Sequence, residues 1–186
     1  MKRVFDIIIS IIILILLAIP MIFIAIVILL TSKGGILYWS NRVGINSTIY
    51  KMPKFRTMKI NTPEVATHLL GSAGMHLTPV GKFLRRYSLD ELPQFFSVIK
   101  GDMSLVGPRP ALYNQDKLIA LRKECGLDKL LPGITGWAQV NGRDELSIID
   151  KITLDKEYID LCSFWFDIRI MWLTLLKVLK SEGVAH

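Results

Sequence analysis

Two adjacent acids, Asp90 and Glu91, lie between arginines in the stretch Arg85–Pro110. Arg85 precedes them by about one helical turn, and Arg109 follows between two prolines that restrict its backbone. A guanidinium held in this way offers paired donors to phosphate oxygens, although an ion pair with a carboxylate elsewhere in the domain is the alternative role. Magnesium typically binds one or two carboxylates together with substrate phosphates. The grouping therefore predicts a magnesium–diphosphate site with Asp90 and Glu91 as metal ligands.

The same acids are expected in the first turn of a helix over Asp90–Lys100. Pro93 is comfortable only where helical N–H groups have no partner, so Asp90 is expected as the N-cap; a capping box from Ser88 to Glu91 is the competing assignment. Either arrangement places the carboxylates at the positive end of the helix dipole, where they stay ionised. Helix capping alone is the structural alternative for the pair.

The rest of the domain is predicted to consist of short strands and helices. The stretches "GGILYWSNRVG" and "YKMPKFRTM" are predicted as strands, and Asn61–Gly81 as an exposed connection. Helices are predicted over Ala111–Cys125 and Leu146–Leu161, and a last helix begins near Asp167. The expected fold class is α/β, predominantly helical with short strands.

An apolar segment over Ile7–Leu30, interrupted only by Ser10 and Pro20, is predicted to enter a membrane. As a straight helix it would reach ~36 Å, enough to cross a hydrocarbon core of ~30 Å. Pro20 removes one helical N–H and crowds the carbonyl of Leu16, which kinks helices. Because basic residues flank both ends, the positive-inside rule gives neither end a reason to face outward. A kinked span and a re-entrant hairpin both remain open.

The last helix is a second candidate for membrane contact. It is basic and apolar, and it carries Trp172 near its middle. These properties suit the headgroup boundary of a membrane, although an apolar helix of this length is equally typical of a protein core. The basic flanks of the first segment favour the membrane slightly.

Composition leaves several classes of partner open. Lys and Arg outnumber Asp and Glu by 23 to 16, a formal net charge of +7, which attracts anionic lipid, nucleic acid or phosphorylated substrates. Cys125 and Cys162 have neither metal-binding nor disulfide-framework spacing, which favours a reducing, cytoplasmic setting. The sequence has no Walker loop, no GxGxxG and no serine-hydrolase elbow, so ATP and nicotinamide chemistry lack support.

Four motifs in one order carry a specific resemblance over about Lys2 to Val184. The motifs "KFRTM", "SLDELPQ", "KGDMSLVGPRP" and "PGITGWAQVNGR" resemble those of the bacterial sugar transferases known as monotopic phosphoglycosyl transferases. The resemblance implies transfer of a sugar 1-phosphate from a UDP-sugar to a polyprenyl phosphate, with release of UMP, as the first membrane step of glycoconjugate assembly. It also implies a monotopic protein at the cytoplasmic face of the bacterial inner membrane, with a re-entrant helix broken at Pro20 and both helix ends cytoplasmic.

The resemblance further implies two parts and assigns roles to single residues. Residues 1–34 would form the re-entrant anchor, and residues 35–186 a catalytic domain with interfacial amphipathic helices on the phospholipid membrane. The implied roles are Asp90 as a nucleophile that forms a covalent aspartyl-phosphosugar, Glu91 as its assistant through Mg²⁺ or proton handling, Arg85 on a phosphate, Arg109 and Arg143 on donor phosphates or uridine, and Asp167 as a functional acid.

Several of these assignments have structural alternatives. Asp167 could be an ordinary N-cap of the apolar helix that follows it. Gln139 and Asn141 could contact the nucleobase or sugar, or be parts of a strand and an Asn-Gly turn. Many family members have serine before the membrane proline, whereas Ile19 precedes Pro20 here, which leaves the depth of the break open.

Two other classes of protein are alternatives to the transferase. A non-catalytic membrane-anchored protein that binds anionic lipid or nucleic acid would explain the charge and the anchor. It would not explain a rigid "GPRP" beside adjacent carboxylates, so no nucleic-acid partner is expected. A polytopic transferase that makes the same lipid product by direct attack would need several membrane spans, and the sequence offers one.

Overall fold

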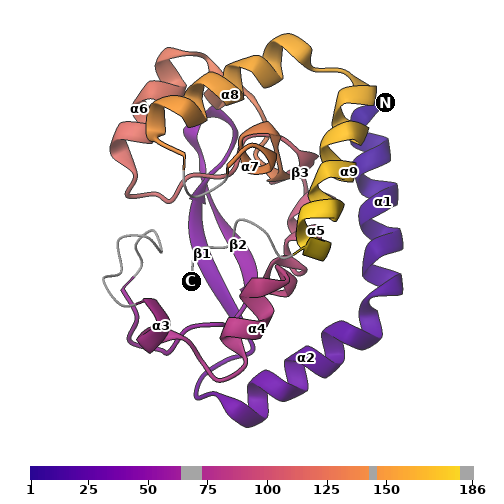
Figure 1. Ribbon diagram of the computed structural model, residues 1–186, viewed down its shortest axis with the longest axis vertical. Coiled ribbons are helices and arrows are strands. Elements are labelled where there is room, and N and C mark those ends of the chain that lie inside the picture. The colour runs from indigo at the N-terminus through magenta and orange to yellow at the C-terminus, as the bar shows by residue number, and fades with distance from the viewer. Residues whose placement is uncertain (64–72, 143–145, 181–186) are drawn as a thin grey trace.

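The computed structural model describes residues 1–63, 73–142 and 146–180. Helices predominate and the strands are short, which confirms the predicted α/β class at this level. Figure 1 shows a bent helix pair along one edge of the molecule, with the last helix beside its first arm and a long hairpin inside. These elements are α1 (Lys2–Leu16), α2 (Ala18–Thr31), α9 (Phe164–Lys180), β1 (Leu37–Val43) and β2 (Ile49–Phe55).

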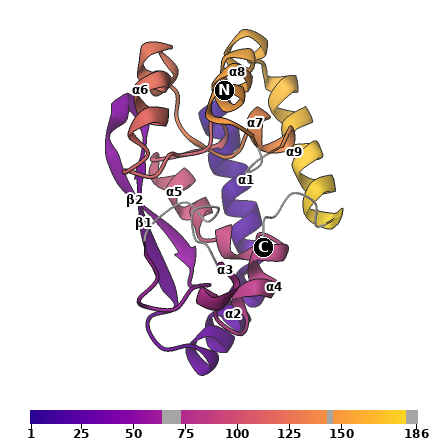
Figure 2. The same ribbon diagram turned by 60° about the vertical axis from the view of Figure 1, so that its left-hand side comes forward.

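The other elements complete the fold. Figure 2 shows α5 (Gln94–Lys100) lying between the hairpin and α1. In chain order they are a 3₁₀ turn at Ile45–Ser47, α3 (Ala73–His76), α4 (Gly81–Arg86), a 3₁₀ turn at Leu89–Glu91, α5 (Gln94–Lys100), β3 (Ser104–Val106), α6 (Asp116–Glu124), a 3₁₀ turn at Leu127–Lys129, β4 (Gly133–Thr135), α7 (Trp137–Val140) and α8 (Ile148–Leu161).

The strands form two separate pairs. β1 and β2 are antiparallel, with Tyr38 opposite Lys54, which confirms both strands predicted from the sequence. β3 and β4 are parallel, with Ser104 opposite Gly133. A Cβ on Gly133 would lie 2.2 Å from the backbone nitrogen of Gly107, so glycine permits this close approach of two chains. The approach packs the "PGITG" motif directly against the "VGPRP" motif.

Three predicted helices begin at different residues in the structure. The helix expected from Asp90 begins at Gln94, after Pro93, and ends as predicted at Gly101, whose φ is 105°. The helix expected from Ala111 begins at Asp116, because the chain at residues 111–112 pairs with β1 instead. The last helix begins at Phe164, so Asp167 lies within its first turn and does not precede it.

The bend in the N-terminal helix pair lies just before Pro20. The two arms meet at Leu17 with an angle of 62°, and Pro20 occupies the first turn of α2. There its missing N–H costs no hydrogen bond, and the break removes the clash with the carbonyl of Leu16. Within the described residues, no single helix is long and apolar enough to cross a membrane, although the bent pair taken together meets that requirement by length and composition.

Helix α1 has an inverted surface, because it buries its polar residues and exposes apolar ones, unlike an ordinary surface helix. Its polar residues Asp6 and Ser10 are 3% and 0% exposed, whereas Ile15 and Leu16 are 70% and 71% exposed. The Ser104 hydroxyl donates to Asp6 Oδ2 at 2.7 Å, which gives the buried carboxylate a partner inside the domain. An apolar outer face of this kind marks an interaction surface and suits contact with lipid.

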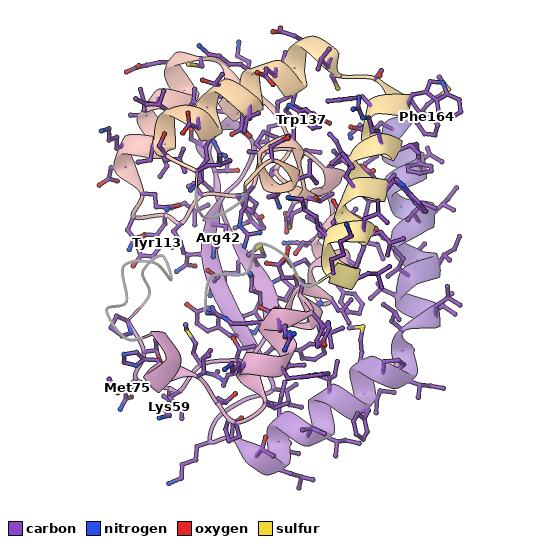
Figure 3. The ribbon with its side chains drawn as sticks, in the orientation of Figure 1. Arg42, Lys59, Met75, Tyr113, Trp137 and Phe164 are labelled. Atoms are coloured by element: carbon purple, nitrogen blue, oxygen red, sulfur yellow. The ribbon has the colours of Figure 1, made fainter. Side chains whose placement is uncertain are left out.

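Basic residues fix the start of α1 to the domain. Arg3 donates to the carbonyl of Ile99 at 3.0 Å, near the carboxyl end of α5, and to the carbonyl of Met103. Phe164, which is labelled in Figure 3, lies at the start of α9. The ring of Phe5 packs edge-on against it, with ring centroids 5.1 Å apart. Helix α1 is therefore docked on the same short helix that follows the acidic pair.

The main core lies among β2, β3, α5, α7, α8 and α9. Its centre consists of side chains with almost no exposure: Val98, Met103 and Ile170. A second cluster joins Ile24 and Ile28 of α2 to the strand β2 and helix α4. On α9, Ile170 is buried while Trp172 is 59% exposed, so this helix has one face in the core and another face outward. The core alternative is thus confirmed for one face of α9, and membrane contact of the outward face stays a prediction.

Candidate active site

The acidic pair lies in a 3₁₀ turn before α5. Ser88 enters this turn in the left-handed region, with a φ of 54°, and makes no side-chain capping hydrogen bond. The N-cap of α5 is Pro93. The predicted capping roles of Asp90 and Ser88 are therefore wrong, because the helix starts after the proline and not before it. Asp90 and Glu91 are nevertheless buried, at 6% and 9% exposure.

Glu91 is held by two cations from different parts of the chain. Lys54 Nζ donates to Glu91 Oε1 at 2.9 Å, and Arg109 Nη2 donates to the same oxygen at 3.1 Å. Lys54 comes from β2 and Arg109 from the loop after β3. Arg109 thus forms an ion pair, which is its structural alternative, and the partner is Glu91 of the acidic pair. This contact places Arg109 beside the site whichever role it has.

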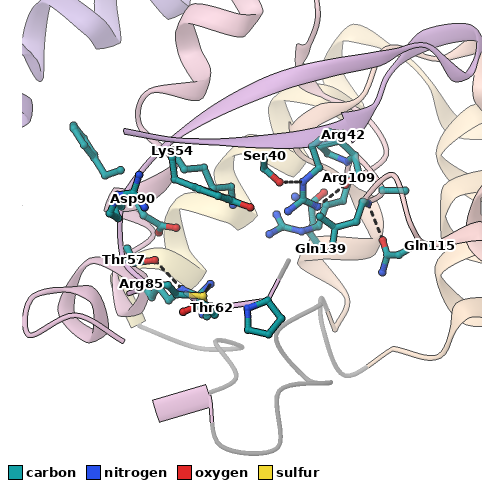
Figure 4. Close-up of a pocket in the computed structure, with 18 of the residues that line it drawn as sticks. Ser40, Arg42, Lys54, Thr57, Thr62, Arg85, Asp90, Arg109, Gln115 and Gln139 are labelled. Atoms are coloured by element: carbon teal, nitrogen blue, oxygen red, sulfur yellow. Dashed lines mark hydrogen bonds between the residues drawn. The ribbon is translucent and has the colours of Figure 1, made fainter. Parts of the chain in front are cut away.

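Asp90 lines a cavity of about 210 Å³ whose charged walls are mostly cationic (Figure 4). Arg85 lies on one side, where its Nε donates to Thr57 Oγ1 at 3.2 Å. Arg42 lies on the other side, where its guanidinium donates to Ser40 Oγ at 3.0 Å and to the carbonyl of Pro110 at 3.1 Å. A buried carboxylate surrounded by guanidinium and ammonium groups forms a site for a polyanion. We call this cavity the basic pocket.

The hairpin supplies one wall of the basic pocket by strand alternation. Tyr38, Ser40 and Arg42 of β1 all line the pocket, and Lys54, opposite Tyr38, lines it from β2. Residues two apart in a strand face the same side of a sheet, so Tyr38, Ser40 and Arg42 point together. The hairpin thus presents a polar face to the acidic turn.

Burial shifts the ionisation of two of these cations. Desolvation lowers the pKa of the Lys54 ammonium below its ordinary value, although the carboxylates of Glu91 and Asp90 oppose the shift. Desolvation, together with the positive charge of Arg109, lowers the pKa of Arg42 to about 10. An anionic ligand would oppose both shifts by favouring the charged forms.

A buried ion pair supports the loop that carries Arg109. Arg122 Nη2 of α6 donates to Asp155 Oδ2 of α8 at 2.7 Å. Arg122 Nη1 donates to the backbone carbonyl of Arg109, also at 2.7 Å. Both side chains are largely buried. The pair therefore ties α6 and α8 to the proline-flanked arginine of the site.

The structure brings together most of the residues predicted for the site. Asp90, Arg85, Arg109 and Gln139 line the basic pocket, and Glu91 contacts it through its ion pairs. Gln139 lies in α7, so its predicted place in a strand is wrong. Its Nε2 donates to the carbonyl of Ile134 at 2.8 Å, while its buried Oε1 has no hydrogen-bond partner in the described part of the chain. Such an acceptor suits a hydroxyl or N–H donor of a ligand.

Two predicted residues lie elsewhere, and a third cannot be placed. Asn141 is exposed and donates to the carbonyl of Trp137 at 2.8 Å. Asp167 is buried and accepts hydrogen bonds from Lys2 and from the Tyr158 hydroxyl. Neither is among the described residues that line the basic pocket. Arg143 lies outside the described residues.

Sequence reasoning missed Lys54, Arg42 and Arg122 as site residues. Lys54 belongs to the "KFRTM" motif, which could have indicated a role in the site. Arg42 is two residues after Ser40 in the same strand, so strand alternation could have placed both on one face. Arg122 lies in a helix with cationic neighbours and gives no local signal.

Asp90 and Glu91 fit a magnesium ion whose coordination shell is completed by the phosphates of a substrate. No group of three or more His, Cys, Asp or Glu side chains suited to a metal occurs among the residues that the structure describes. Magnesium usually takes one or two carboxylates and completes its shell with water and substrate phosphates. Asp90 and Glu91 can supply that number, and Glu91 Oε1 is already engaged by Lys54 and Arg109.

Comparison with known proteins identifies the family. A family model described as "Bacterial sugar transferase" matches residues 1–181. The chain is 39% identical to the "Uncharacterized sugar transferase EpsL" of Bacillus subtilis over its whole length, which covers 91% of that protein.

Two longer relatives have names that state an acceptor. The chain is 39% identical to the "UDP-glucose:undecaprenyl-phosphate glucose-1-phosphate transferase" of Escherichia coli, with 95% of this chain and 40% of that protein aligned. It is 37% identical to the "Undecaprenyl-phosphate galactose phosphotransferase" of Salmonella typhimurium, with 98% of this chain and 41% of that protein aligned. The chain thus spans less than half the length of these two relatives.

Proposed function

Because this chain belongs to the bacterial sugar transferase family, we propose that it transfers a sugar 1-phosphate from a UDP-sugar to a membrane polyprenyl phosphate, releasing UMP. The product is a polyprenyl-diphospho-sugar, which would start assembly of a bacterial glycoconjugate. The names of the Escherichia coli and Salmonella typhimurium relatives support an undecaprenyl phosphate acceptor. The observation that carries the proposal is the buried acidic pair inside the basic pocket.

The cations of the basic pocket would bind the diphosphate of the donor. Arg42, Arg85 and Arg109 approach from three different segments, and their planar forks match phosphate oxygens. Lys54 adds an ammonium beside the acids. Together these groups offset the repulsion between a diphosphate and the two carboxylates. Glu91 would hold Lys54 and Arg109 in place through its two ion pairs.

Asp90 would act as the nucleophile. One of its carboxylate oxygens attacks the sugar-bearing phosphorus and forms an acyl phosphate, while the bond from that phosphorus to the bridging oxygen breaks and UMP leaves. The phosphate of the polyprenyl acceptor then attacks the same phosphorus. This second step forms the lipid diphosphate and returns Asp90 to its free carboxylate, so the two substrates react at Asp90 in turn.

Magnesium is the cofactor that suits this site. Bound by Asp90, Glu91 and the donor phosphates, it would neutralise charge on the diphosphate and make UMP a better leaving group. The protein's part is to hold both carboxylates in one buried turn beside the cations.

The membrane arrangement that suits the acceptor is a monotopic one. The inverted surface of α1 and the bend at Leu17 support a re-entrant anchor in the cytoplasmic leaflet of the bacterial inner membrane, with both of its ends cytoplasmic. The outward face of α9, which includes Trp172, would lie at the headgroup boundary. Residues 35–186 would then rest on the phospholipid surface as the catalytic domain.

The reaction is tested by incubating the purified protein with magnesium, undecaprenyl phosphate and each of a panel of UDP-sugars. At least one UDP-sugar should give UMP and a lipid diphosphosugar in equal amounts. An Asp90→Asn variant, folded as judged by its melting temperature, serves as the control and should give neither product. A protein that releases no UMP with any donor would instead support non-catalytic binding of anionic lipid.

A further inference from the structure

The acidic pair separates two cavities of opposite character. Asp90 lines the basic pocket of about 210 Å³, whereas its neighbour Glu91 lines a second cavity of about 640 Å³. Gln139 lines both. The turn that carries the two acids therefore borders two cavities, the basic pocket and this second, larger cavity.

The second cavity is a mainly apolar groove between α1 and α9, and we call it the α1–α9 groove. Figure 1 shows the two helices side by side, and both contribute walls to the groove. Its volume lies within the range of ~300–1,000 Å³ typical of small-molecule sites. The apolar residues from this part of the fold are Ile9 and Ile13 of α1, Leu17 at the bend, and Met171, Leu175 and Val178 of α9.

Charges occur in only part of this lining. Among the described residues around the groove, Arg86 and Lys177 carry positive charge and Glu91 carries negative charge. Arg86 lies over the ring of Tyr87, with its guanidinium carbon 5.8 Å from the ring centroid. An apolar channel with cations in its lining suits a ligand with a hydrocarbon tail and an anionic head.

The groove also borders the side of the molecule that suits lipid. Leu17, at the bend of the helix pair, is one of its walls, and the neighbouring Leu16 is among the most exposed apolar residues of α1. A hydrocarbon chain could pass from lipid into the groove without crossing water, so it would avoid the cost of ~0.8 kcal/mol that each methylene exposed to water carries.

We propose that the α1–α9 groove binds the isoprenoid tail of the polyprenyl phosphate acceptor, with the phosphate beside Arg86 and the acidic pair. This inference rests on the proposed function for the identity of the ligand. It assigns the donor to the basic pocket and the acceptor to the groove, so that the two substrates approach the acidic pair through different cavities.

Bulky substitutions in the groove test the assignment. Leu175→Trp and Ile13→Trp place a large ring in the tail site and should raise the KM for undecaprenyl phosphate about tenfold, a cost of ~1.4 kcal/mol. The KM for the UDP-sugar should change by less than about twofold. Leu176→Trp is the matched control, since Leu176 is the next residue of α9 and does not line the groove. Equal acceptor KM values for all three variants would overturn the assignment.

A cross-linking measurement on the unaltered protein keeps the test independent of folding and of turnover. A polyprenyl phosphate with a diazirine near its phosphate end should label peptides of α1 and α9 that line the groove, and undecaprenyl phosphate should compete. Competition by dioleoyl phosphatidylglycerol at equal concentration would mean a general phospholipid site and would contradict the proposal.

The two proposals fail separately. Labelling of the groove without UMP release from any donor would leave the lipid site in place and remove the transferase reaction. Normal transfer with labelling outside α1 and α9 would keep the reaction and remove the groove as the acceptor site.

Discussion

Lys54 Nζ lies 2.9 Å from Glu91 Oε1, and this contact joins the carboxyl end of β2 to the turn that carries Asp90. Only 14% of the Lys54 side chain is exposed, so the ammonium is held largely out of water. Its charge is maintained by the two carboxylates against the cost of burial. The protonation state of Lys54 therefore contributes to the net charge of the candidate active site.

The first prediction concerns the alkaline limb of activity. The lowered pKa of Lys54 means that the ammonium loses its proton at a lower pH than an ordinary lysine does, so kcat/KM should fall as pH rises through that pKa. In Lys54→Arg, whose guanidinium has an ordinary pKa above ~12, the limb should move to higher pH. Lys51→Arg, on the exposed side of the same strand, is the control and should keep the original limb. Identical profiles for Lys54→Arg and the unaltered protein would exclude a role for the Lys54 charge.

The second prediction separates stability from positioning at Arg122 and Asp155. Arg122→Met leaves the Asp155 carboxylate buried without its partner, which should lower the free energy of unfolding by ~3–5 kcal/mol. Arg122→Met with Asp155→Leu removes both charges and should recover most of that loss. Activity should stay low in the double variant, because the carbonyl of Arg109 has lost its donor. Recovery of both stability and activity would show that Arg122 has a structural role alone.

The third prediction assigns Asp167 to the attachment of α1. Its carboxylate joins Lys2 and Tyr158, and the Tyr158 hydroxyl donates to it at 2.7 Å. Asp167→Asn should lower the free energy of unfolding by ~1–3 kcal/mol, measured by denaturation in detergent, and leave the KM for the UDP-sugar unchanged. Asp160→Asn, on the exposed side of α8, should change neither quantity. A raised donor KM with unchanged stability would return Asp167 to the substrate site.

The fourth prediction concerns topology. Single cysteines at Lys2, before the bent helix pair, and at Lys33, after it, should show the same protection in intact cells if the anchor is re-entrant. Lys33 is exposed and 41% of the Lys2 side chain is exposed, and Cys125 and Cys162 are replaced by serine in the parent protein. An impermeant thiol reagent should label both positions only after lysis. Labelling of only one of the two positions in intact cells would establish a kinked span.

Much of the site was predictable because its parts are close in sequence. The acids and Arg109 are separated by one short helix and one short strand, and the adjacent prolines and glycines constrain that stretch locally. The two strands followed from their turn residues and composition, and the bend near Pro20 followed from the missing N–H of proline.

Other features depend on contacts between distant segments. The helix start at Asp116 reflects pairing of residues 111–112 with β1, which outweighs local helix propensity. The contacts of Lys54 with Glu91 and of Arg122 with Asp155 join residues 37 and 33 positions apart. The burial of Asp6 and Ser10 in an otherwise apolar helix depends on the domain that packs against α1, and Ser104 supplies the partner for Asp6.

The most direct test of the account is a single-substrate experiment on Asp90. Protein given a UDP-sugar that supports transfer, with magnesium and no lipid acceptor, should release about one UMP per active site and gain the mass of one phosphosugar on the peptide that contains Asp90. Asp90→Asn should abolish both signals, because an amide cannot attack, whereas Glu91→Gln should slow the burst and leave the adduct on Asp90. If a fully active preparation shows no adduct, and no UMP until polyprenyl phosphate is added, direct transfer takes place and the covalent mechanism is wrong.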